Sequence, residues 1–272
     1  TDRDGIDLDC VRDVVVERCR VNTPNDDAIV VKSSYALGHA VAAENIVIRH
    51  CAVSGFDLGT LLDGTRRTTQ ALAPDRDRVT GRIKLGTESN GGYRNVRIED
   101  CSFTHCRGLA LETVDGGVME QIVARRLTMT DVTTAPLFLR LGDRRRGPAG
   151  TGSGAIRDVT IEDVTATGID HRYPAALAGL PGHAIEHVTL RNIVLTYRGG
   201  GTAADAARRP EEHASAYPEP SMFGTLPAWG LWLRHACDIT IDGLRLATAT
   251  PDARPRFLAD DVQRLSVHDS AL

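Results

Sequence analysis

Aromatic residues are scarce in this chain of 272 residues, at 4% of the total. A hydrophobic core with so few rings has to be built from Val, Ile and Leu, and the β-branched members of that set favour strands. Glycine is abundant, at 26 residues, which fits many turns between short strands. This composition favours an all-β protein.

Long apolar runs are also absent, because no stretch approaches the roughly 18 residues that span a membrane. The first ten residues, TDRDGIDLDC, contain no methionine, no basic stretch and no apolar stretch, so no signal peptide is visible. The chain starts on what resembles a strand. We therefore expect N-terminal coils or a cap to be missing from it.

The chain also has no excess of basic residues. Lys and Arg total 32 and Asp and Glu total 36, which gives a net charge of −4. General binders of nucleic acids or anionic membranes are usually basic. We expect neither nucleic acid nor membrane among the partners, and we expect a monomer.

No CxxC pair is present, which argues against a structural zinc site. The six cysteines are spread along a chain that is too long to resemble a small disulfide-stapled domain. We expect no metal and no other cofactor.

What the sequence does contain is an internal repeat of polar residues followed by alternating apolar residues, a charged turn and a second apolar pair. Alternation with period two predicts strands, and the polar turn between two strands predicts a corner. The copies are RDVVVERCRV (12–21), ENIVIRHCAV (44–53), RNVRIEDCSF (94–103), EQIVARRLTM (120–129), RDVTIEDVTA (157–166), EHVTLRNIVL (186–195), CDITIDGLRL (237–246) and the degenerate VQRLSVHDS (262–270).

A repeat of this length predicts a solenoid, in which each coil buries its apolar face by stacking on its neighbours. Leucine-rich repeats would show a regular LxxLxL, and propeller blades would need about four strands per 40–45 residues. We predict one domain over residues 1–272, an all-β single-stranded right-handed parallel β-helix. Cys19, Cys51 and Cys101 hold equivalent positions in three copies, so we expect a column of buried thiols rather than disulfides.

The stretch NTPNDDAIVVKSS (22–34) places Asp26 and Asp27 directly before a β-branched run. Asn, Pro and Asp are common in turns, which gives one interpretation of the pair. The other interpretation is catalytic. Glycosidases use paired carboxylates as a general acid and a base around the bond that they cleave.

Three ordered motifs favour the catalytic interpretation. They are DRDGID (2–7), NDDAIVVKS (25–33) and LGTESNGGYRNVRIEDC (85–101). They resemble the N-T-D-G, G/Q-D-D and G-S-E-x-S-G-G-x-R-N-V segments of glycoside hydrolase family 28, the polygalacturonase and rhamnogalacturonan-hydrolase family. The resemblance covers most of the chain, residues 1–200, and implies a pectin-lyase-like right-handed β-helix.

The resemblance implies that Asp4, Asp26 and Asp27 are catalytic and that the glycosidic bond is cleaved with inversion, without a cofactor. Asp27 would be the general acid, with Asp4 as the other candidate, and Asp26 would help to position water. The 22 residues between Asp4 and Asp26 are about one coil. All three carboxylates should therefore stack on one face.

Two further motifs of the family are altered. Asp57 stands where the histidine of its G-H-G motif should be, and Ala110 and Glu112 replace the Arg and Lys of its R-I-K motif. A literal GRIK, with Arg82 and Lys84, occurs one coil earlier. Asp57 and Glu112 should lie on nearby coils of the same face and flank these two basic residues. The family's basic pair holds a uronate carboxylate. We therefore expect a neutral sugar at the cleavage site, or an acid held differently by Lys32, Lys84 and Arg140.

Arg140 is expected in one column with Lys84, two repeats further on. The insertion 197–235 concentrates aromatic residues that form a platform for sugars or anchor the loop on the wall of the helix. The candidate substrate-binding residues are Lys32, Asp57, Arg82, Lys84, Glu88, Glu112, Arg140 and Trp229.

The chain is thus predicted to be a secreted or periplasmic glycosidase acting on a polysaccharide or oligosaccharide. Two alternatives remain from other classes. A non-catalytic β-helix would serve as an adhesin or carbohydrate-binding protein. A polysaccharide lyase would normally need a Ca²⁺ site and a basic catalytic residue.

Overall fold

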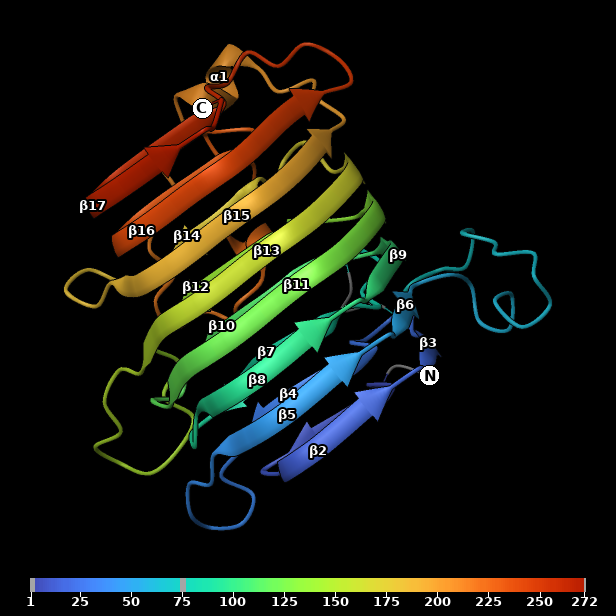
Figure 1. Cartoon of the computed structure of the whole chain (residues 1–272), viewed down its shortest axis with the longest axis vertical. Helices are drawn as coiled ribbons and strands as arrows, with labels where there is room; N and C mark the ends of the chain where they lie inside the picture. The colour runs from blue at the N-terminus through green and yellow to red at the C-terminus, as the bar shows by residue number, and fades with distance from the viewer. Residues whose placement is uncertain (1–2, 74–76, 272) are drawn as a thin grey trace.

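The computed structural model describes residues 3–73 and 77–271. Their strands pair in parallel, coil upon coil, in a right-handed parallel β-helix, as the repeat predicts (Figure 1). The elements are β1 (Ile6–Asp9), β2 (Arg12–Glu17), β3 (Arg20–Asn22), β4 (Ile29–Ser33), β5 (Ala43–Arg49), β6 (Ala52–Ser54), β7 (Ile83–Ser89), β8 (Tyr93–Glu99), β9 (Ser102–Cys106), β10 (Leu109–Thr113), β11 (Val118–Val132), β12 (Leu137–Leu141), β13 (Ala155–Ile169), β14 (Ala175–Ala178), β15 (Ile185–Tyr197), α1 (Ala203–Ala206), the 3₁₀ helix η1 (Pro220–Phe223), β16 (Leu231–Thr248) and β17 (Phe257–His268).

The repeat copies form one face of the solenoid, in the order β2, β5, β8, β11, β13, β15, β16 and β17. Each of these strands pairs in parallel with the next. Equivalent apolar residues lie in register along this face and point into the core. One such column contains Val14, Ile46, Val96, Ile122, Val159, Val188, Ile239 and Leu265.

The second residue of the first three copies adopts the left-handed conformation. Asp13, Asn45 and Asn95 have φ of 56°, 56° and 51°, a region in which Asn and Asp are the most tolerated residues after glycine. Their side chains also stack. The amide of Asn45 donates to Asp13 Oδ1 at 2.8 Å, and the amide of Asn95 donates to Asn45 Oδ1 at 2.9 Å. The repeat therefore encodes both the bend and the spacing of the coils.

The predicted column of thiols is confirmed. Cys19, Cys51 and Cys101 follow one another on neighbouring coils and pack in the main core, and all six cysteines are free. The same column continues through Leu127, Val164, Ile193 and Leu244, so the thiols take the place of aliphatic side chains.

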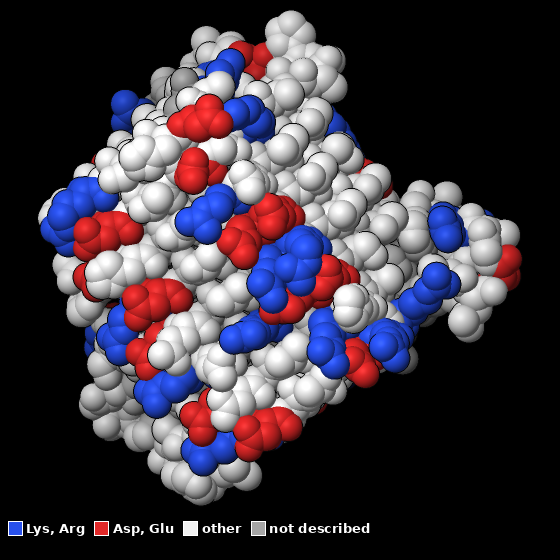
Figure 2. Space-filling model, viewed as in Figure 1, with Lys and Arg blue, Asp and Glu red and all other residues white. Residues whose placement is uncertain are grey.

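Acidic and basic side chains alternate over the face formed by the long strands (Figure 2). Many of them pair between coils. Glu120, for example, lies 2.7 Å from Arg94 on one neighbouring coil and 2.6 Å from Arg157 on the other. Exposed pairs of this kind contribute little to stability, about 0–1 kcal/mol each. They do leave this face mixed in charge.

A second face, built from β1, β4, β7, β10, β12 and β14, carries both apolar and charged side chains on its outer side. Phe138, Ala176 and Trp232 project outward from consecutive coils and would be exposed without a cover. Phe223 and Leu226 of the insertion between β15 and β16 pack on them in a separate small core. The insertion is thereby fixed over this face.

The described part of the chain contains no helix long and apolar enough to cross a membrane. A long loop joins β6 to β7 and projects from the side of the solenoid, in cyan (Figure 1).

Candidate active site

The three predicted aspartates meet at the amino-terminal edge of the second face. Asp4 precedes β1, and Asp26 and Asp27 precede β4 on the next coil. The two coils are joined by a hydrogen bond of 2.9 Å from the Gly5 amide to the Asp27 carbonyl. One carboxylate oxygen from each aspartate lies within 4.8 Å of the others. The expectation that the three stack on one face is confirmed.

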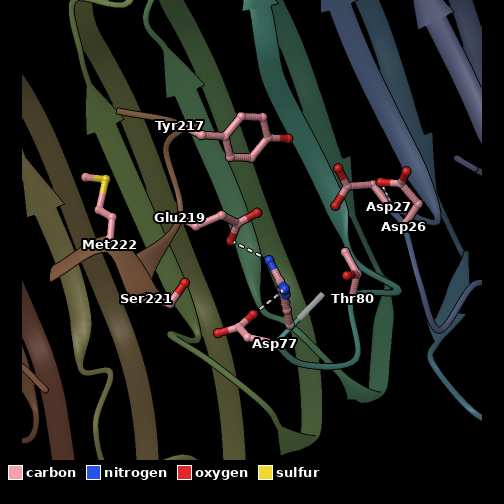
Figure 3. A pocket seen from close by; sticks show the side chains of 9 residues that line it. Asp26, Asp27, Asp77, Thr80, Tyr217, Glu219, Ser221 and Met222 are labelled. Carbon is pink, nitrogen blue, oxygen red and sulfur yellow. Dashed lines mark hydrogen bonds and ion pairs between the residues drawn. The ribbon is translucent and has the colours of Figure 1, made fainter. Parts of the chain in front are cut away.

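Two cavities meet at these carboxylates, one of about 430 Å³ and one of about 320 Å³. Both are lined by Asp26, Asp27 and Tyr217. In Figure 3 the two aspartates face the segment that carries Tyr217 and Glu219 across the larger cavity. The larger cavity is also lined by Asp77, Thr80, Arg107, Glu219, Ser221 and Met222. The smaller is also lined by Arg3, Asp4, Asp7, Lys32, Lys84, Gly86, Thr87 and Glu88.

Asp27 is held in its charged form by neighbouring cations. Its Oδ1 accepts from Arg82 Nε at 2.8 Å, and its Oδ2 lies 3.4 Å from Lys84 Nζ. Burial by itself raises the pKa of Asp27, but the charges of Lys84, Arg82 and Arg107 outweigh burial and hold the net pKa well below the ordinary range. Asp27 is therefore ionised at neutral pH.

Lys32, on β4, forms ion pairs with two aspartates of the preceding coil. Its Nζ lies 2.8 Å from Asp4 Oδ2 and 2.6 Å from Asp7 Oδ2. Burial tends to lower the pKa of Lys32, but its hydrogen bonds to the two aspartates outweigh burial and raise the pKa above its usual value. Lys32 thus keeps its charge and fixes the position of the Asp4 carboxylate.

Glu112 lies behind Lys84, fully buried, with its Oε2 3.4 Å from Lys84 Nζ. Neither carboxyl oxygen has a hydrogen bond within the described residues. Burial is the largest influence on the carboxyl and raises its pKa to about 7, against the lowering effect of Lys84 and Arg82. The expectation that Glu112 flanks Arg82 and Lys84 is confirmed.

The sequence did not indicate Glu219, Arg107 or Asp77. Glu219 comes from the distant insertion and pairs with Arg82 and Arg107, and Arg107 also lies 3.1 Å from Asp77 (Figure 3). The backbone amide of Arg107 donates to the carbonyl of Thr80 at 2.7 Å, which stacks Arg107 on the coil after Arg82. Counting coils along this edge would have found Arg107. No local pattern would have found Glu219.

The GRIK segment (81–84) lies on the coil directly after that of Asp26 and Asp27. Arg82 and Lys84 are 1% exposed and flank Asp27 on the adjoining coil. Glu88, at the end of the same strand, borders the smaller cavity and lies 3.3 Å from Arg144. These three expected residues are therefore brought to the site.

Asp57 does not join them. Its carboxylate accepts from the backbone amides of Thr69 and Gln70 at 2.9 and 2.8 Å and so closes the projecting loop on itself. The expectation that Asp57 lies beside Glu112 is wrong, because the chain leaves the solenoid at this point. Arg82, opposite Ala28 on the next coil, is the side chain that contacts Asp27.

The expected register of Arg140 is also wrong. Lys84 pairs with Ala110, whereas Arg140 pairs with Glu112, so Arg140 lies in a different column. Its guanidinium donates to the backbone carbonyls of Gly179 at 3.1 Å and Glu212 at 2.7 Å. Arg140 thus anchors the insertion and lines neither cavity.

Trp229 is placed in the core rather than in the cleft. It is 7% exposed and packs edge-on against Tyr197 at 5.8 Å. Phe223 and Trp232 belong to the small core under the insertion. Tyr217, by contrast, is 53% exposed and lies over Lys84, with its hydroxyl 3.2 Å from Nζ. Phe223, Trp229 and Trp232 thus anchor the insertion. Of these three and Tyr217, only Tyr217 lines the cavities.

The three aspartates form the acidic group that offers the best geometry for a metal within the described residues. Cationic side chains already bind two of them, since Lys32 contacts Asp4 and Arg82 and Lys84 contact Asp27. A divalent cation would have to share its ligands with three positive charges. The donor set therefore fits a proton-transfer site better than a metal site.

Comparison with known proteins adds to this geometry. No protein-family model matches the chain. A probable polygalacturonase from Vitis vinifera is 22% identical over 257 residues, which cover 90% of this chain and 46% of that protein. The crystal structure of a hyperthermoactive exopolygalacturonase from Thermotoga maritima superposes with a TM-score of 0.55 at 25% identity, over 71% of this chain and 39% of that one. The chain is similar in sequence and fold to polygalacturonases.

The polygalacturonase-like chain spans less than half the length of either relative. The matches support the resemblance to glycoside hydrolase family 28 that the ordered motifs indicated. They also agree with the β-helix built by the repeat.

Proposed function

We propose that the chain is a glycoside hydrolase that cleaves a plant or microbial polysaccharide by inversion, without a cofactor. The observation that carries this proposal is the meeting of Asp4, Asp26 and Asp27 at the junction of two cavities. A glycan lying through both cavities would present one glycosidic bond to the three carboxylates. The polygalacturonase relatives give independent support for a pectin-type polymer as substrate.

The charges around the aspartates suggest their roles. Arg82 and Lys84 keep Asp27 ionised, which suits a group that orients or deprotonates water better than a proton donor. We therefore transfer the role of general acid from Asp27 to the pair formed by Asp4 and Asp26.

The stereochemistry follows from where water is held. Oxygens within 4.8 Å of one another can share one bound water, which would then attack the sugar while another carboxyl protonates the leaving oxygen. In glycosidases with two catalytic carboxylates, a separation of about 5–5.5 Å goes with retention and one of about 6.5–9.5 Å with inversion. The short separation here would favour retention by that rule, so the proposal of inversion rests on the shared water and on the family resemblance. Proton NMR of the first product decides the matter. Inversion is expected, and a product of unchanged anomeric configuration would contradict it.

One set of incubations distinguishes the hydrolase from two alternatives, a lyase and a carbohydrate-binding or adhesin protein. The substrates are polygalacturonate, rhamnogalacturonan, arabinan and galactan. Release of reducing ends without ultraviolet absorbance from a new double bond is expected. Absorbance that disappears with a chelator would indicate a lyase instead. Binding to a glycan without any cleavage would indicate a carbohydrate-binding or adhesin protein.

Two further properties are part of the proposal. Residues 1–272 form a single catalytic β-helix domain, and the protein acts as a monomer outside the cytoplasm, in the periplasm or after secretion. The localisation rests on the place where such polysaccharides occur.

A further inference from the structure

The carboxylate of Glu219 sits where an anionic ligand would bind. Its two oxygens accept from the two ends of the Arg82 guanidinium at 2.5 and 3.1 Å, and its Oε2 lies 2.7 Å from Arg107 Nη1. Two-pronged binding by arginine is the geometry with which proteins hold carboxylates and phosphates. Glu219 is therefore a built-in ligand of this arginine pair.

The arginine pair belongs to the cleft. Arg107 and Glu219 line the cavity of about 430 Å³ together with Asp26 and Asp27. Arg82 connects the Glu219 carboxylate to the candidate catalytic Asp27, because it forms an ion pair with each of them. A sugar bound beside the aspartates would meet these guanidinium groups if the Glu219 side chain were absent.

The segment that carries Glu219 is held firmly in place. Pro220 and Phe223 are buried, and Phe223 packs edge-on against Trp232 at 5.1 Å. Arg140 lies over the Phe223 ring at 5.4 Å and donates to the carbonyl of Glu212 earlier in the same insertion. Glu219 is thus a resident part of the cleft wall.

Every cation of the cluster already has a carboxyl partner when Glu219 is present. Arg82 and Lys84 lie against Asp27, and Arg82 and Arg107 lie against Glu219. The carboxylate of a uronic acid entering the cavity would find its natural partners occupied and would add a like charge beside Asp27 and Glu219. A neutral sugar would instead offer hydroxyl donors to these carboxylates.

We propose that Glu219 is a specificity-determining residue that fills the carboxylate position of the cleft and so excludes a uronate in favour of a neutral sugar. The proposal rests on the glycoside hydrolase function and defines its substrate class at the cleavage site. It assigns to a residue of the distant insertion the role that a substrate carboxylate would otherwise have.

The test compares the binding of α-1,4-linked digalacturonate and of the corresponding neutral galactobiose by isothermal titration calorimetry at pH 7. The wild-type protein is expected to prefer galactobiose. Glu219→Gln removes the charge that pairs with the arginines, and a substrate carboxylate can displace the uncharged side chain. Digalacturonate should therefore bind the variant about tenfold tighter or more than the wild type. Galactobiose affinity should change little.

Two controls make the result specific. Glu211→Gln, on the exposed part of the same insertion, should behave as wild type. Adding Arg107→Gln to Glu219→Gln should remove the gain. Digalacturonate that binds Glu219→Gln no tighter than wild type, including no binding to either, would overturn the proposal.

Two further safeguards apply. If Glu219→Gln does not fold, a wild-type preference for digalacturonate over galactobiose overturns the proposal by itself, and a preference for galactobiose supports it. Binding does not depend on hydrolysis. Failure of the hydrolase proposal would therefore show separately, as the absence of reducing ends from every polysaccharide.

Discussion

Arg82 and Asp27 form an ion pair on adjoining coils, 2.8 Å from Nε to Oδ1, with the two side chains 1% and 6% exposed. The pair joins the candidate catalytic edge to the basic strand beside it. Because Arg82 also binds Glu219, the pair connects three segments that are far apart in the sequence. The pair helps to keep Asp27 charged and links it, through Arg82, to Glu219 of the cleft wall.

The first prediction concerns Asp27→Asn and stability. Removing one partner of a buried ion pair typically costs about 3–5 kcal/mol, because the other charge remains buried. The folded pKa of Asp27 is lowered, so its stabilising effect is present above the unfolded carboxyl pKa of about 4 and is lost as the pH falls further. Urea unfolding should show the variant to be less stable at pH 7, with a gap that narrows below about pH 4. A gap that stays constant down to pH 3 would disprove the linkage.

The second prediction concerns Glu112→Gln. The folded pKa of Glu112 is raised to about 7, so the stability that it contributes is complete below about pH 4.5 and is lost as the pH rises through 7. Gln cannot ionise. The variant should match the wild type at pH 5 and exceed it at pH 8, by on the order of 2 kcal/mol in denaturant unfolding. Glu186→Gln, on the exposed side of β15, should show no such trend, and a variant that is less stable at pH 8 would refute the account.

The third prediction concerns Arg140→Ala. Arg140 donates to backbone carbonyls of the insertion, and hydrogen bonds to charged groups are worth about 1.5–3 kcal/mol each. Its loss should loosen residues 197–230, which limited proteolysis would detect as faster cleavage within them. Arg97→Ala, on the exposed side of β8, is the matched control. Equal cleavage rates in the two variants would show that Arg140 is not the anchor.

The fold could be predicted from the sequence because its information is local and repeated. Asp13, Asn45 and Asn95 mark equivalent bends, and the alternating residues after each bend mark the strand. The register of the second face could not be predicted in this way. The spacing of Arg140 from Lys84 depends on where long loops leave and rejoin the solenoid, and the sequence of a loop does not specify that point.

Part of the candidate site could be predicted because it, too, lies in short motifs that recur with the period of the coils. Asp4, Asp26 and Asp27 lie in short ordered motifs one coil apart, so their meeting followed from the period. Glu219 contacts Arg82 across 137 residues of chain, through an insertion that matches no repeat. Trp229 was expected at the cleft because rings are scarce. Trp229 instead belongs to the main core, and Phe223 and Trp232 pack with Phe138 in the small core under the insertion.

The most direct test of the central claim measures reducing-end release by Asp4→Asn, Asp26→Asn and Asp27→Asn on the polysaccharide that the wild type cleaves fastest. Each variant should lose about 10²- to 10⁴-fold in turnover, the usual contribution of a positioned proton-transfer group, while its circular dichroism spectrum stays that of the wild type. Asp13→Asn, at a corner of the solenoid, should keep its turnover within about twofold, as expected for a surface substitution. Near-normal turnover in any of the three, or no cleavage of any glycan by the wild type, would contradict the account.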